Sequence, residues 1–144
     1  MMTLQIYNHD DDIDVTHKIN TIELDNWISH LEFIRKEVRN LIKMGITRQQ
    51  VKQNNNDVLQ RLRKKEKEND TLLDALNTYA FNIPKIAECD TIQCDMVFIS
   101  EHEKYRRNYL YHLDKYKRLK NEFLESVRGG FAITKHGSHK SYGI

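Results

Sequence analysis

Apolar residues recur every three or four positions over three long stretches of the chain, which is the spacing of one face of an α-helix. The clearest stretch runs from Ile92 to Val127 and is followed by Gly129 and Gly130. Its repeating face carries aromatic residues, histidines and leucine: Phe98, His102, Tyr105, Tyr109, His112, Tyr116, Leu119 and Phe123. The pattern predicts a long helix over about 91–128.

A shorter helix is predicted over about 21–44. Its apolar face is formed by Leu24, Trp27, Leu31, Ile34, Val38 and Leu41. Asn20 is placed to cap its start, and Gly45 suits the left-handed position at which many helices end. Thr47 then begins a capping box that restarts the chain. A second helix over about 47–83 should therefore lie antiparallel to the first.

The second predicted helix has a polar middle, because Arg63–Thr71 contains no apolar residue. The helix either continues through this segment or breaks near Asn69 and Asp70. We favour continuity, because lysine, glutamate and arginine are strong helix formers. Pro84 should end the helix.

Together these elements predict an all-α fold, an elongated antiparallel three-helix bundle with coiled-coil character over residues 20–129. At about 1.5 Å per residue, the first helix spans roughly 35 Å and each of the others roughly 55 Å. The far half of the longer hairpin would then expose its apolar flank, which favours a homodimer. The residues expected to carry this self-association are Leu72, Leu76, Tyr79, Ile92, Met96 and Ile99.

The length of 144 residues suits one domain, and the net charge of +2 is too small to indicate a nucleic-acid binder by itself. The charge is unevenly distributed: residues 1–19 form an acidic segment and residues 130–144 a basic one, and we expect both to be flexible. No secretory segment and no apolar run of transmembrane length occur in the sequence. We therefore expect a cytoplasmic protein with no membrane contact.

Candidate chemistry is sparse. Cys89 and Cys94 form a weak metal motif without a second pair, and we favour loop thiols without a function over a redox or intermolecular disulfide. His102 and His112 are ten residues apart, too far along a helix to bind one ion together. We interpret them as core histidines. The sequence predicts no cofactor, no metal and no catalytic set.

Two basic clusters suggest a different function. If the hairpin turns near residue 87, Lys65 lies opposite Tyr109, and the clusters could form one belt that binds nucleic acid. The expected contacts are Arg61, Lys64, Lys65, Arg106, Arg107, Lys135 and Lys140. Interleaved glutamates favour solvated helix faces instead.

Several heptad positions resemble a family of small uncharacterised bacterial proteins built as three helices. The resemblance is carried by Trp27, Leu31, Phe33, His102, Arg106, Tyr116, Leu119, Lys120, Glu122 and Phe123. It covers the first and third predicted helices, and it implies the fold but no activity.

The sequence thus favours a non-enzymatic protein-interaction or scaffold module that pairs with itself through the far part of its hairpin. The alternative is an RNA- or ribosome-associated protein that uses the basic belt and the C-terminal tail. A metal-dependent stress protein of ferritin-like shape is a remote third hypothesis.

Overall fold

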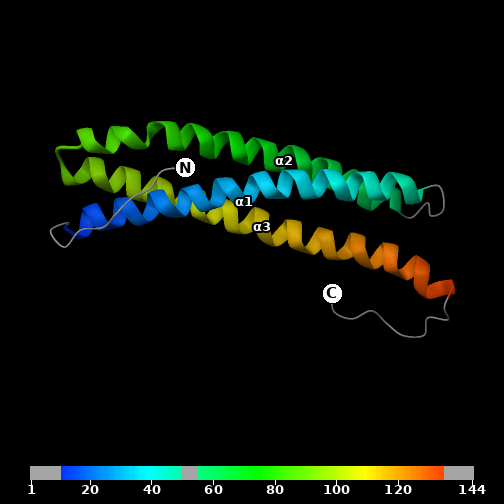
Figure 1. Cartoon of the computed structure of the whole chain (residues 1–144). Helices are drawn as coiled ribbons and strands as arrows, with labels where there is room; N and C mark the ends of the chain where they lie inside the picture. Colours follow the sequence, from blue (N-terminus) through cyan, green and yellow to red (C-terminus); the bar gives the residue numbers. More distant parts are fainter. Residues whose placement is uncertain (1–10, 50–54, 135–144) are drawn as a thin grey trace. The chain divides into compact units, whose positions relative to one another are not determined.

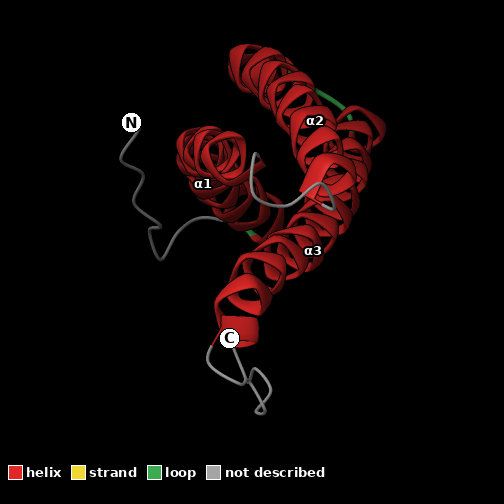
Figure 2. Cartoon of the chain, turned by 90° about the vertical axis from the view of Figure 1, so that its right-hand side faces the viewer, coloured by secondary structure: helices red, strands yellow, loops and turns green. Residues whose placement is uncertain are grey.

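The computed structural model describes residues 11–49 and 55–134, with side chains described over 11–47 and 57–128. Three α-helices follow one another (Figure 1): α1 (Asp12–Gln49), α2 (Asn55–Asn82) and α3 (Ile92–Thr134). A short 3-10 helix, η1 (Ile83–Glu88), continues directly from α2. The described ranges contain helices and loops and no strand (Figure 2). The predicted all-α fold with three helices is confirmed.

The first helix begins earlier than predicted, because the acidic segment caps it. The Asp11 Oδ1 atom accepts a hydrogen bond from the Asp14 backbone N–H at 2.7 Å. Asp12 and Asp14 lie in the first turn, where the helix dipole favours negative charge. The prediction of a flexible arm over 1–19 is therefore wrong for residues 12–19, and residues 1–10 lie outside the described part.

The predicted end of the first helix at Gly45 is also wrong, because this glycine is a packing position inside α1. A Cβ atom at Gly45 would lie 2.9 Å from Leu59 Cδ1 and 3.1 Å from Phe123 Cε1. A larger residue at this position would have to displace the Leu59 methyl and press on the Phe123 ring, so glycine lets the three helices approach closely. Thr47 is not a cap either, since its hydroxyl donates to the Lys43 carbonyl at 3.1 Å within the helix.

The second helix is continuous through Arg63–Thr71, as the sequence favoured. α2 ends at Asn82, as Pro84 predicted, but the helical path continues because Pro84 occupies the first turn of η1, where its missing N–H costs nothing. The chain reverses only after Glu88, and Thr91 Oγ1 then caps α3 by accepting the Cys94 N–H at 3.1 Å. The turn therefore lies about three residues later than residue 87, and this changes which residues of α2 and α3 face one another.

The third helix also exceeds its prediction, since it continues through Gly129 and Gly130 to Thr134. The expected flexible tail is therefore helical over 130–134. Residues 135–144 lie outside the described part of the chain.

Contacts divide the chain into two compact units that are described separately. Unit 1 comprises Met1–Phe33 and Asp70–Tyr111, and unit 2 comprises Ile34–Asn69 and His112–Ile144. The buried hydrophobic residues of unit 1 are Leu24, Trp27, Leu31, Leu73, Leu76, Tyr79 and Tyr109. Those of unit 2 are Ile34, Val38, Leu41, Ile42, Val58, Leu59, Leu62, Tyr116, Leu119 and Phe123. Each unit thus has its own core, formed by segments of all three helices.

The homodimer was predicted because a short first helix would leave the far half of the hairpin uncovered. The early start of α1 changes this expectation. Within unit 1, the His17 Nε2–H group donates to Asp95 Oδ1 at 2.9 Å, so α1 reaches the first turns of α3. Leu76 and Tyr79 are 0% and 3% exposed. These two residues belong to the core of their own chain and offer no surface to a second copy.

Candidate functional site

A basic pocket lies between α2 and α3 in unit 2. It has a volume of about 380 Å³ and is lined by Arg61, Lys64, Lys65, Glu68, Lys115, Arg118, Leu119 and Glu122. Five cationic side chains thus face two carboxylates around one open cavity. Such a charge balance suits an anionic ligand.

Two of the five cations are held in place by carboxylates. Arg61 binds Glu122 through both guanidinium Nη atoms, one of them at 3.1 Å, and this ion pair lowers the pKa of the Glu122 carboxyl. Lys65 is buried, and its Nζ lies 2.7 Å from Glu68 Oε1, an interaction that lowers the pKa of Glu68. Both cations therefore lie beside a carboxylate before any ligand enters.

The other three cations lie at the exposed rim. Lys64 is exposed and forms no ion pair with another described residue. Lys115 is also exposed, and Arg118 lies 3.1 Å from Asp114 in a pair with both side chains mostly in solvent. Exposed pairs of this kind are weak and exchange readily for another anion.

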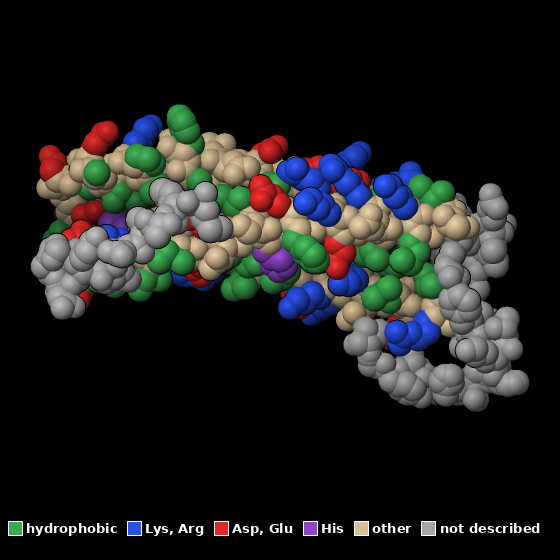
Figure 3. Space-filling view, in the orientation of Figure 1, with side chains coloured by type: hydrophobic (Ala, Val, Ile, Leu, Met, Phe, Trp, Pro, Cys, Tyr) green, Lys and Arg blue, Asp and Glu red, His purple; other side chains and the backbone are tan. Residues whose placement is uncertain are grey.

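The fold separates charge between the two units. The described side chains of unit 1 include 13 acidic and 5 basic residues, a net charge of −8. Those of unit 2 include 7 acidic and 14 basic residues, a net charge of +7. In Figure 3, blue side chains gather over the segments of α1 and α2 that belong to unit 2. A net charge of +2 for the whole chain conceals this separation.

The predicted basic belt is only half correct. Arg61, Lys64 and Lys65 do come together, but their neighbours across the pocket are Lys115 and Arg118. Arg106 and Arg107 belong to unit 1, where Arg106 is bound by Glu23. The late turn causes this difference, because it moves the α2–α3 register by about two helical turns. Lys135 and Lys140 lie outside the described residues.

Aromatic residues are absent from the described rim of the pocket, contrary to the prediction. Tyr109 is buried in unit 1 and hydrogen-bonds His30, and Tyr105 stacks on Tyr79. Within the described part of unit 2, the aromatic side chains are Tyr116 and Phe123, and both are buried. In the described part of unit 2, nucleic-acid bases therefore have no exposed aromatic side chain on which to stack.

The residues predicted to mediate self-association are divided by the fold. Leu76 and Tyr79 are buried, while Leu72 and Ile99 are half-buried. Ile92 and Met96 remain exposed, at 65% and 46%. Phe81 and Val97 of the same segments are exposed as well, at 81% and 63%, so self-association through this part of the hairpin stays a prediction.

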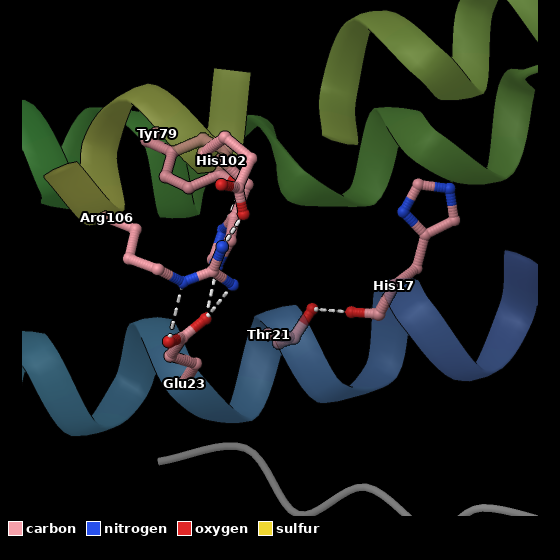
Figure 4. A network of polar contacts seen from close by, with 7 residues as sticks. His17, Thr21, Glu23, Tyr79, His102 and Arg106 are labelled. Atoms are coloured by element: carbon pink, nitrogen blue, oxygen red, sulfur yellow. Dashed lines mark hydrogen bonds and ion pairs between the residues drawn. The ribbon is translucent and has the colours of Figure 1, made fainter. Parts of the chain in front are cut away.

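A second cluster, buried in unit 1, connects all three helices (Figure 4). His102 is 1% exposed and stacks on Trp27 of α1. Its Nε2–H donates to Glu23 Oε1 at 2.8 Å, because a carboxylate can only accept. Its Nδ1 then accepts the Tyr79 hydroxyl at 2.7 Å. Because burial also lowers the pKa of His102, we assign a neutral imidazole with the proton on Nε2.

One cationic side chain balances the carboxylate of this cluster. Arg106 binds both oxygens of Glu23, at 3.0 and 2.6 Å, and this lowers the pKa of Glu23. Burial lowers the pKa of His102, although Glu23 opposes that shift. Burial also raises the pKa of the Tyr79 hydroxyl, which stays protonated. All the hydrogen-bonding positions of His102 are used, so we assign the cluster a structural role.

Polar contacts between α1 and α3 recur at intervals of seven residues. His30 Nδ1 meets the Tyr109 hydroxyl at 2.5 Å, seven residues beyond Glu23 and His102. In unit 2 the Tyr116 hydroxyl donates to Glu37 at 2.7 Å, seven residues further again. Lys120 also binds Glu37, at 2.8 Å, as Arg106 binds Glu23 in unit 1. Polar pairs thus recur once per heptad between these two helices.

His112 confirms its interpretation as a core residue. It is 7% exposed, and its Nε2–H donates to the buried Asn69 Oδ1 at 2.8 Å. Over the described ranges, no group of three or more histidine, cysteine or acidic side chains is placed to hold a metal ion. Within the same ranges, no helix is both long enough and apolar enough to cross a membrane.

Comparisons with known protein families, with curated proteins and with solved structures found no match to this chain. The resemblance to a family of small three-helix bacterial proteins therefore stays a prediction.

Proposed function

We propose that the chain is a non-enzymatic nucleic-acid-binding protein that holds phosphates on the basic surface of unit 2. The observation that carries this proposal is the pocket in which five cations face two carboxylates. Lysine and arginine neutralise phosphates and release their counterions, which is the main source of sequence-independent affinity.

The extent of the positive charge favours a polymer over a single small anion. Basic side chains of unit 2 come from all three helices, for example Lys36 and Lys43 on α1 and Lys67 on α2. All three are exposed. A polymer with a phosphate at every residue would contact several of them at once, whereas one small anion would use the pocket alone.

The buried aromatics determine the mode of binding. Because Tyr116 and Phe123 face the core, binding would depend on phosphate contacts and not on base stacking. The expected result is weak discrimination between sequences and a steep dependence on salt. The basic C-terminal residues Lys135 and Lys140 belong to this proposal only as additional positive charge.

Charge reversal at the pocket rim tests the proposal. The variant Lys64→Glu, Lys115→Glu, Arg118→Glu should weaken binding of a labelled mixed-sequence RNA by at least about tenfold at low salt. Fluorescence anisotropy gives the affinity between about 50 and about 200 mM salt. The slope of log affinity against log salt should fall by roughly 2, since each contact to a single strand contributes about 0.7.

Unit 1 offers a matched control with the same residue types and the same change in charge. Lys85→Glu, Lys104→Glu, Arg107→Glu alters three exposed residues outside the pocket. This control should bind RNA within about twofold to threefold of the wild type. Equal weakening in both variants, or no binding by the wild type at low salt, would contradict the proposal.

A further inference from the structure

The only two cysteines of the chain form a disulfide at the α2–α3 turn of unit 1. Cys89 is the capping residue directly after η1 and Cys94 lies in the first turn of α3, with their Cα atoms 5.5 Å apart. Both residues are half-buried, so small molecules can reach them. The sequence favoured two unlinked thiols, and the structure corrects that prediction. The late turn brings the two side chains together.

The disulfide lies next to the contact that holds the start of α1. Asp95, the residue after Cys94, accepts the hydrogen bond from His17 at 2.9 Å. The Asp95 backbone N–H in turn bonds the Thr91 carbonyl at 3.3 Å, inside the segment that the disulfide closes. The bridge therefore constrains the backbone from which the Asp95 side chain reaches α1.

The small size of the bridged loop limits what the disulfide does for the whole fold. Only five positions separate Cys89 from Cys94. Short loops lose little entropy on closure, so their disulfides contribute less to global stability than those of long loops. An effect on local geometry is therefore the larger expected consequence.

We propose that Cys89 and Cys94 form a reversible thiol–disulfide site that controls how firmly the first turns of α1 pack on the start of α3 within unit 1. The oxidant is a small disulfide. One protein thiolate attacks a sulfur of that disulfide and releases one small thiol, leaving a mixed disulfide. The second protein thiolate then attacks the protein-bound sulfur and releases the second small thiol. Two protein thiols are oxidised to one disulfide while the small disulfide is reduced to two thiols.

Local charge selects the kind of small disulfide. Glu88 and Asp90 flank Cys89 in the sequence and Asp95 follows Cys94, and the described side chains of unit 1 carry a net charge of −8. This field repels anionic disulfides such as glutathione disulfide and attracts cationic ones such as cystamine. At low salt the site should therefore react several-fold faster with cystamine than with glutathione disulfide. Added salt should reduce this difference in rate.

The exchange chemistry is tested on the full chain by thiol titration and mass spectrometry. The reduced protein should show two reactive thiols, and cystamine should convert it to a monomer with no free thiol. Excess cysteamine should return both thiols. Free thiols after cystamine treatment, a disulfide-linked dimer, or a bond that resists cysteamine would each overturn the proposed site.

Hydrogen exchange measured by mass spectrometry tests the control of α1. Amides of residues 12–20 should exchange several-fold faster in the reduced protein, while those of residues 58–65 in unit 2 should not change. The double variant Cys89→Ser, Cys94→Ser should show the fast exchange with or without oxidant. Identical exchange of residues 12–20 in the oxidised and reduced proteins would overturn the proposed control.

A variant of the connecting residue completes the test. Asp95→Ala, which removes the acceptor of the His17 hydrogen bond, should still form the disulfide, but its residues 12–20 should exchange faster even when oxidised. If this variant docks α1 as firmly as the wild type in both redox states, the connection does not run through Asp95 and the proposal fails.

Discussion

The two units are built from segments of the same three helices and each buries a hydrogen-bonded histidine, His102 or His112, yet their exposed faces carry opposite charge. Unit 1 buries its histidine His102 among Tyr79, Glu23 and Trp27 and presents an acidic surface. Unit 2 has a core made largely of aliphatic residues and presents a basic surface. Heptad spacing determines which face of each helix is buried. That spacing does not determine the residue types on the exposed faces. In this chain the exposed residues make unit 1 acidic and unit 2 basic.

The largest expected loss of stability comes from the aliphatic core of unit 2. Phe123 is 0% exposed and packs against Gly45. Phe123→Ala should lower the free energy of unfolding by about 3–5 kcal/mol, because it leaves a cavity that the helices cannot close. Denaturant unfolding followed by circular dichroism measures the change. Leu110→Ala, at a position 53% exposed, serves as the control and should cost under about 1 kcal/mol.

A change of less than about 1 kcal/mol for Phe123→Ala would show that the core of unit 2 is not tightly packed. The comparison between the units would then lose its physical basis.

The buried histidine His102 of unit 1 should make stability depend on pH. Burial lowers the pKa of His102 below its ordinary value of 6.5, so the folded chain binds this proton more weakly than the unfolded chain does. The contribution of neutral His102 to the free energy of unfolding should therefore be fully present above pH 6.5. It should decrease as the pH falls below 6.5. Glu23, whose pKa is lowered mainly by Arg106, adds a second loss below its ordinary value of 4.5.

The variant His102→Gln isolates the first step. It should cost roughly 1–3 kcal/mol at neutral pH, since it disturbs buried hydrogen bonds. It should also remove the decline of unfolding free energy just below pH 6.5, while the decline at lower pH persists. Wild-type stability that is constant or rises between pH 7.5 and 5.5 would contradict the assigned neutral His102.

The smallest expected effect concerns the close approach at Gly45. Replacing glycine by alanine in a helix gains about 1 kcal/mol from backbone propensity. At Gly45 the new Cβ would press on Leu59 Cδ1 and Phe123 Cε1. Because the leucine methyl is the flexible end of its side chain, we expect the two effects to cancel to within about 1 kcal/mol. The larger Gly45→Val should destabilise by about 1–3 kcal/mol, and a stabilised Gly45→Val would exclude close packing there.

Much of the fold was predictable because periodicity and helix propensity act locally. The apolar stripe of α3 and the continuity of α2 through Arg63–Thr71 both follow from short-range rules. The start of α1 was missed although its signal is visible. Asp11 followed by Asp14 has the spacing of a side-chain cap, but an acidic run is equally typical of a solvated arm.

The candidate site was harder to predict, because it depends on where the hairpin turns. Pro84 suggested an end to the helix, but η1 continued the helical path to Glu88. A shift of a few residues at the turn replaces Arg106 and Arg107 by Lys115 and Arg118 opposite Lys64. The hydrogen-bonded pairs Asn69–His112 and Tyr79–His102 define how α2 and α3 are aligned. Sequence alone did not identify these residues as partners.

The role of Gly45 shows a further limit of sequence analysis. A glycine near the end of an apolar stripe is typical of a helix terminus. The close contact with Leu59 and Phe123 involves residues far away in the chain, so local rules cannot detect it.

Chemical footprinting of lysines tests the central claim, that one unit binds nucleic acid and the other does not. Acetylation of the full chain, with and without RNA at low salt, is measured at each lysine by mass spectrometry. We expect RNA to protect Lys64, Lys67, Lys115 and Lys117 of unit 2 and to leave Lys85 and Lys104 of unit 1 reactive. Equal protection in both units, or protection confined to unit 1, would contradict the account.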